Sequence, residues 1–142
     1  VEGNTKLKAG EDTLKARMHD ARARALDDGV LYRLSLSEDG KSIQIAPDDP
    51  AAAADAGHTA TTNTEKLPDG IIAKVTAQDG VEATVDQTGW IRVATFTPEG
   101  TCREDTVEVQ VFDTKAKNAP PIRIRIRGVT GVIRTVKPGA DR

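Results

Sequence analysis

The side chains that most often carry chemistry are scarce in this chain of 142 residues, which holds two histidines and one cysteine. His19 and His58 have no aspartate, glutamate or cysteine at a spacing typical of a zinc site. Cys102 precedes Arg103, whose charge would lower the pKa of a neighbouring thiol, but the sequence offers it no partner histidine. We therefore expect His19 on a polar helix face, His58 in a loop and Cys102 as an unreactive thiol.

Motifs of other catalytic and metal sites are also missing from the sequence. No G-x-S-x-G nucleophile elbow occurs, so a serine hydrolase is unsupported. Asp48, Asp49 and Asp55 lack the regular spacing of the oxygen ligands in a calcium-binding loop. The sequence therefore predicts a protein that is not an enzyme, with no catalytic residues, no metal site and no cofactor.

A row of basic side chains stands out near the C-terminus. Arg123, Arg125 and Arg127 alternate with isoleucines, so they share one face of a predicted strand, and Arg134 follows them. Such a row could track the phosphates of DNA or contact a partner. A net charge of −2 and an aromatic content of 3% disfavour DNA binding. The alternative is a solvated strand face whose arginines pair with Glu108 across the sheet.

The elements that would position these side chains begin with an amphipathic helix, predicted over residues 12–28. Asp12 or Thr13 supplies an oxygen for the N-terminal cap, and Gly29 supplies the left-handed residue that ends the helix. Residues 1–11 are interpreted as a flexible leader or an artificial boundary. Apolar residues at spacings of four, three and four form a narrow face that we expect to dock the helix on a sheet: Leu14, Met18, Ala21 and Ala25.

Short strands follow the helix, separated by turn signals such as residues 38–41, 78–80 and 97–100. A surface excursion is expected over residues 47–64 and a flexible tail over residues 137–142. Hairpin links leave no helical crossover for a parallel sheet, so we predict one α+β domain over residues 12–136, an N-terminal helix packed on mostly antiparallel sheet. The expected strands are 30–36, 42–46, 71–77, 81–85, 90–96, 106–112, 122–127 and 130–136.

The order of five segments resembles the soluble domain of H-type (GspH) minor pseudopilins of type II secretion systems and of the related FimT-type minor pilins. The resemblance covers most of the chain. The first segment is the helix end ARARALDDG running into the strand VLYRLSL. The others are the turn EDGK, the strand opening LPDGI, the strand ending FTPEGT, and the final segment RIRIRGVTGVIR.

The resemblance implies a structural, non-catalytic subunit of a type II secretion pseudopilus or a related type IV pilus-like filament. Its partners would be other pseudopilins or pilins, and the inner membrane through an apolar helix preceding residue 12, with the globular domain in the periplasm. Some FimT-type pilins are DNA receptors, so the alternative is a minor pilin that binds DNA through Arg123, Arg125, Arg127 and Arg134. A third hypothesis is a free-standing extracytoplasmic binding module that shares only the architecture.

Overall fold

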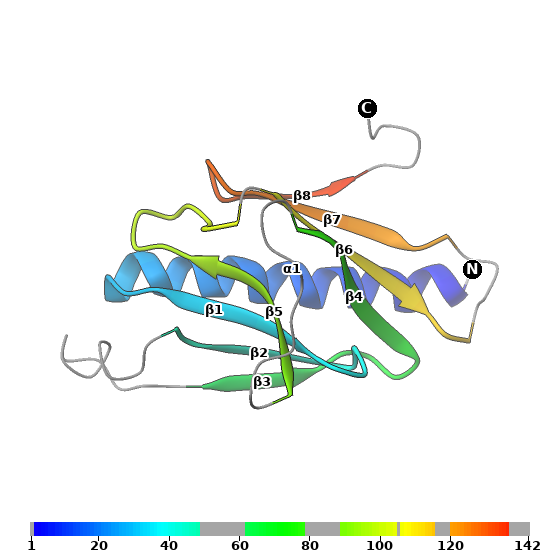
Figure 1. The fold of residues 1–142 in the computed structure, drawn as a ribbon. Coiled ribbons are helices and arrows are strands. Elements are labelled where there is room, and N and C mark those ends of the chain that lie inside the picture. The colour runs from blue at the N-terminus through cyan, green and yellow to red at the C-terminus, as the bar shows by residue number, and fades with distance from the viewer. Residues whose placement is uncertain (1, 49–61, 79–88, 105, 116–119, 137–142) are drawn as a thin grey trace.

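The computed structural model describes residues 2–48, 62–78, 89–104, 106–115 and 120–136. Within these residues a long helix, α1 (Glu2–Asp28), is followed by strands that form two antiparallel sheets (Figure 1). The predicted α+β class, with an N-terminal helix on antiparallel sheet, is confirmed. The strands are β1 (Tyr32–Ser37), β2 (Ser42–Pro47), β3 (Asn63–Lys66), β4 (Ile71–Gln78), β5 (Trp90–Phe96), β6 (Thr106–Asp113), β7 (Ile122–Arg127) and β8 (Val132–Val136).

The strands divide between the sheets in a simple way. One sheet has the order β3-β2-β1-β5 and the other has the order β4-β6-β7-β8. Helix α1 runs the length of the domain and contacts strands of both sheets (Figure 1). The core between them is almost entirely aliphatic, and its largest fully buried side chains are Tyr32 and Phe96. Because the helix is buried against the sheets from Leu7 to Ala25, it is held by packing rather than by intrinsic helix propensity alone.

Helix α1 begins at Glu2, so the prediction of a flexible leader over residues 1–11 is wrong for the described residues 2–11. Two features explain the longer helix. Leu7, seven residues before Leu14, is 3% exposed and extends the buried stripe by two turns. Gly10 faces the sheet, where an added Cβ would lie 2.6 Å from Cγ2 of Ile71. A glycine that weakens an isolated helix is thus required here for close packing.

The strand β3 lies partly within the segment expected to be a surface excursion, residues 47–64. Its four residues are all polar and mostly exposed, so they carry none of the alternating apolar pattern that predicts a strand. The strand exists because its backbone pairs with the edge of β2, from Ser42 opposite Lys66 to Ile45 opposite Asn63. Pro47, the first residue of the predicted excursion, belongs to β2. Residues 49–61 of the excursion, the predicted strand 81–85 and the predicted tail 137–142 lie outside the described residues.

Elsewhere the predicted strands agree closely with the observed ones. β5 and β7 have the predicted bounds, whereas β1 begins at Tyr32 and β8 at Val132, each two residues later than expected. The late start of β8 follows from a tight turn in which Gly131 has a φ of 72° and donates its N–H to the carbonyl of Arg127 at 2.7 Å. Residues 128–131 therefore belong to the turn between β7 and β8.

Candidate functional site

The side chains predicted to dock the helix lie on one buried face of α1. Leu14, Met18, Ala21 and Ala25 are each 0% exposed. The face continues towards the N-terminus through Glu11 and Leu7, so buried residues recur at alternating spacings of four and three from position 7 to position 25. The sequence interpretation missed Leu7 and Glu11, although this spacing, once extended upstream, was the signal that could have identified them.

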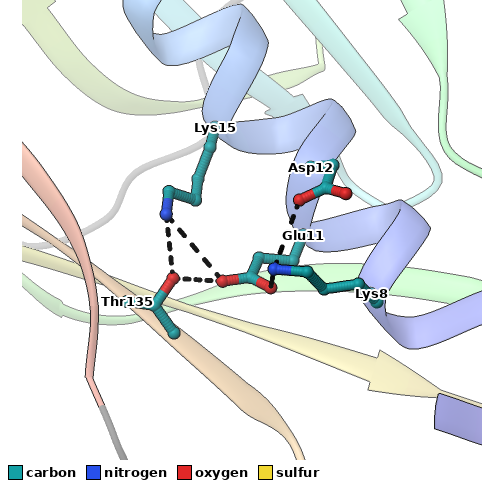
Figure 2. A network of polar contacts seen from close by, with 5 residues as sticks. All are labelled: Lys8, Glu11, Asp12, Lys15 and Thr135. Carbon is teal, nitrogen blue, oxygen red and sulfur yellow. Dashed lines mark hydrogen bonds and ion pairs between the residues drawn. The ribbon is translucent and has the colours of Figure 1, made fainter. Parts of the chain in front are cut away.

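Glu11 is an acidic residue within this otherwise apolar face, and it is 3% exposed. Figure 2 shows its carboxylate between α1 and Thr135 of β8. The hydroxyl of Thr135 donates to Oε2 of Glu11, and Nζ of Lys8 donates to Oε1 at 3.0 Å. Nζ of Lys15 lies 4.0 Å from Oε2 and donates to Thr135 Oγ1 at 3.1 Å. The buried carboxylate is thus fully partnered, as a charge in a core must be.

The protonation of Glu11 follows from these contacts. Burial is the largest influence and raises its pKa, but the hydrogen bonds from Thr135 and Lys8 and the charges of Lys8 and Lys15 outweigh it. The net result is a pKa below the ordinary value of 4.5, so the group is ionised at neutral pH. This network therefore ties the N-terminal part of the helix to the edge strand β8 by charge-assisted hydrogen bonds.

The C-terminal part of α1 is tied to two turns. Nε of Arg22 donates to the carbonyl of Gly100, in the connection after β5, at 2.7 Å. An added Cβ on Gly131, in the turn between β7 and β8, would lie 2.0 Å from the same carbonyl oxygen. The guanidinium group of Arg22 therefore joins the helix to the connection after β5, and the β7–β8 turn packs against that connection so closely that only glycine fits at position 131.

The arginine row lies on the outer face of the sheet, as its alternation with buried isoleucines predicted. Glu108 of β6 is directly opposite Arg125 and forms ion pairs with Arg125 at 3.1 Å and Arg123 at 3.8 Å. Arg134 of β8 is directly opposite Arg125 on its other side, and Arg127 is exposed. The structure thus brings the four arginines together, and Glu108 contacts two of them.

A shallow hollow of about 380 Å³ opens on this face, lined by Thr106, Arg125, Arg127 and Arg134. Arg127 and Arg134 form no ion pair or hydrogen bond in the described part of the chain. Among the described side chains that line it, the hollow therefore has a surplus of positive charge, which suits an anionic group.

A second basic cluster surrounds Asp48 and was not anticipated from the sequence. Its carboxylate forms ion pairs with Arg33 at 3.7 Å, Arg92 at 3.5 Å and Arg103 at 3.9 Å. These arginines come from β1, β5 and the connection after β5, and no periodicity relates them in the sequence. The cluster holds the end of β2 to its neighbours.

The histidines and the cysteine that were first considered for catalysis are not brought together among the described residues. His19 is exposed on α1, whereas His58 lies outside the described residues. Cys102 is buried, and its thiol donates to Oε1 of Glu104 at 3.1 Å. Burial and this carboxylate raise the pKa of the thiol to about 12, so it is protonated at neutral pH. Cys102 is thus the unreactive thiol that the sequence predicted, and the neighbouring Arg103 pairs with Asp48.

Comparison with known proteins adds the following findings. No family model and no curated protein matches the chain. Among solved structures, it is similar to the minor pseudopilin EpsH from the type II secretion system of Vibrio cholerae, in one structure with a TM-score of 0.61 and 14% identity over 98% of this chain and 99% of that one. A second structure of EpsH gives a TM-score of 0.63 and 14% identity, with 100% of both chains covered.

The chain is also similar to the type IV minor pilin FimU of Pseudomonas aeruginosa, with a TM-score of 0.63 and 16% identity over 92% of this chain and 88% of that one. The likeness thus spans the helix and the sheets together rather than one common motif. The chain has the fold of the minor pseudopilins of type II secretion systems, a fold shared with a minor subunit of type IV pili.

Proposed function

We propose that the chain is a structural minor subunit of a type II secretion pseudopilus or a related type IV pilus-like filament, and that it catalyses no reaction. The observation that carries the proposal is the full-length likeness to minor pseudopilin and minor pilin structures, in which this chain and its neighbours cover each other almost completely. The chemistry agrees, because His19 is exposed and is the only histidine of α1, and the thiol of Cys102 is buried and protonated.

We further propose that α1 is the lower part of a longer stem anchored in the inner membrane, with the sheets in the periplasm. Among the described residues, no helix is long and apolar enough to cross a membrane. Support comes from the buried stripe, which already runs from Leu7 to Ala25 and pins the helix to both sheets. A helix held in this way would transmit its orientation to any segment continuing from Glu2.

The gene sequence preceding the codon for Val1 tests the membrane anchor. A short basic leader followed by about 20 apolar residues, the length that a spanning helix needs, is the expected result. A cleavable secretion signal ending near Val1 would instead favour a free-standing extracytoplasmic module and overturn the proposed anchor.

Deletion of the gene in the bacterium that encodes it tests the structural role. We expect loss of type II secretion or of surface pili, and full rescue by the protein carrying His19→Ala and Cys102→Ser, since no chemistry is assigned to either side chain. Normal secretion and normal piliation in the deletion strain would refute the proposal, and failure of this double variant to rescue despite normal folding would point to a catalytic role.

DNA binding through the arginine row is a second candidate, motivated by the hollow at Arg125, Arg127 and Arg134. It has less support than the structural role, because Glu108 places a carboxylate beside Arg123 and Arg125 and would repel a phosphate backbone there.

A further inference from the structure

We propose that the outer face of β7 and β8 is a docking site for a neighbouring protein subunit, through a segment that presents carboxylates beside aliphatic side chains. We call this face the β7–β8 surface and define it as Thr106, Arg125, Arg127, Val132 and Arg134, together with Val129 in the turn between the two strands. The inference rests on the proposed function, because it takes the partner from the other subunits of the filament.

The first observation is an unbalanced charge. Arg125 and Arg134 are directly opposite each other on neighbouring strands, an arrangement in which like charges repel. Glu108 pairs with Arg125 on one side, but in the described part of the chain Arg134 has neither an ion pair nor a hydrogen bond, and the same is true of Arg127. Both side chains are exposed, so they are accessible to carboxylates of a partner. Carboxylates match the planar fork of a guanidinium group well.

The second observation is exposed apolar surface next to these arginines. Val132 is directly opposite Arg127 and is 48% exposed, and Val129 in the preceding turn is 79% exposed. Leu26 at the end of α1 is 44% exposed, and its Cδ2 would lie 3.3 Å from a Cβ added to Gly100. Gly100 in turn contacts the β7–β8 turn, so the exposed large hydrophobic side chains of the described residues gather at one end of the domain.

The position of this end is also suited to a contact between subunits. Figure 1 shows the β7–β8 turn and the connection after β5 at the end of the domain far from the start of α1. The arginines continue from there along the outer face of the sheet. Two backbone hydrogen bonds hold the turn, from the N–H of Gly131 to the carbonyl of Arg127 at 2.7 Å and from the N–H of Cys102 to the carbonyl of Gly128 at 2.9 Å. A partner would therefore meet a preformed backbone at this turn, which lowers the entropy cost of binding.

The combination favours a protein over a nucleic acid. Arginine beside desolvated aliphatic side chains is typical of the energetically important centre of a protein interface. A phosphate backbone gains little from the exposed side chains of Val129 and Val132. The overall charge of −2 also gives no long-range attraction for a polyanion.

Isothermal titration calorimetry provides the test. This protein is titrated against the soluble domains of the other pilin-like subunits encoded in the same gene cluster, and against a short duplex DNA. The first variant combines Arg127→Glu with Arg134→Glu, and the second combines Val129→Ser with Val132→Thr. The matched control combines Lys66→Glu with Lys74→Glu, which changes the charge equally at exposed lysines of other strands.

We expect one subunit to bind, with affinity reduced about tenfold or more by the arginine variant and about fivefold by the valine variant, and unchanged by the lysine control. Folding is not the explanation for such a loss, since the carboxylate introduced by Arg134→Glu would lie opposite Arg125 as a favourable pair. Thermal unfolding should accordingly show an equal or higher Tm for the Arg134→Glu single variant.

Other results overturn the inference in distinguishable ways. Subunit binding that is insensitive to the arginine variant, or equally sensitive to the lysine control, rejects the β7–β8 surface but leaves the proposed function intact. Absence of binding to every subunit, together with normal secretion and piliation after gene deletion, rejects both. Salt-sensitive binding of the duplex DNA that is lost in the arginine variant and kept in the valine variant identifies a nucleic-acid site instead.

Discussion

Replacing Thr135 by valine is a sharp test of how α1 is held on the sheet. Valine keeps the shape and the strand preference of threonine but removes the hydroxyl that donates to Oε2 of Glu11. The carboxylate stays buried at 3% exposure, and that oxygen is left with the ammonium group of Lys15 at 4.0 Å. The substitution therefore removes the hydrogen bond to the buried charge, together with the one that the same hydroxyl accepts from Nζ of Lys15 at 3.1 Å.

The expected loss follows from the cost of leaving a buried charged acceptor without its donor, about 1–3 kcal/mol. We expect the Thr135→Val protein to lose about 2 kcal/mol of unfolding free energy at pH 7 and about 6 °C in Tm for a domain of this size. Thr64→Val, at an exposed position of β3, makes the same chemical change without a buried partner and should alter stability by less than about 0.5 kcal/mol.

The effect also has a definite pH dependence. The pKa of Glu11 is below its ordinary value of 4.5 in the folded protein, so folding favours the ionised group. This contribution to stability is fully present above the unfolded pKa and is lost as the pH falls through the folded pKa. Removing the Thr135 hydroxyl raises the folded pKa, since that hydrogen bond lowers it. The stability difference between the two proteins should therefore be largest at neutral pH and shrink as the medium becomes acidic.

Urea denaturation followed by the fluorescence of the single tryptophan, Trp90, measures both quantities across a pH series. A double-mutant cycle with Glu11→Gln isolates the coupling between the two side chains. Equal stability of the Thr135→Val and parent proteins at pH 7, or a difference independent of pH, would refute the claim that Thr135 and ionised Glu11 fasten the helix.

Three further predictions concern packing and the thiol. Ala21→Phe on the 0% exposed helix face should cost about 1–3 kcal/mol through overpacking, whereas Ala23→Phe on the exposed face should cost less; equal thermal stability of the two would contradict the assigned face. Gly131→Ala should lower the free energy of unfolding more than Gly29→Ala. Both glycines have positive φ, but an added Cβ would clash with a backbone oxygen at Gly131, whereas it would meet no atom within 4 Å at Gly29. Chemical denaturation compares the two variants, and the reverse order would contradict the close packing of the β7–β8 turn. Cys102, with a pKa of about 12, should react with iodoacetamide at pH 8 at least about a hundredfold more slowly in the folded than in the urea-unfolded protein, and equal rates would disprove its burial.

Strands were predicted correctly from the local sequence pattern where buried and less buried side chains alternate along the strand. Arg123, Arg125 and Arg127 alternate with isoleucines, and this alternation was enough to place β7, its exposed face and its pairing with Glu108. Likewise, strands β5 and β6 were recognised from runs of β-branched residues bounded by turns. The alternation of apolar and polar side chains and the residue types of turns depend only on neighbouring residues, so they can be recognised in the sequence alone.

Features that depend on distant residues were missed. The glycine at position 10 resembles a helix breaker until the close approach of Ile71 is known. Strand β3 has a polar sequence and is specified by the free edge of β2, and Asp48 collects arginines from three separate segments. Glu11 was read as part of a leader, because its partner Thr135 is 124 residues away. In each case the tertiary partner, and no local propensity, decides the structure.

Purification of filaments from the bacterium that encodes this protein tests the structural role most directly. Filaments sheared from the cells, or assembled in a strain that overproduces the system, are isolated and their subunits quantified by mass spectrometry and by immunogold labelling of the full-length protein. The account predicts that the protein co-purifies with the filaments as a minor component. Filaments of normal composition that contain none of it, with the protein recovered entirely in other fractions, would contradict the account.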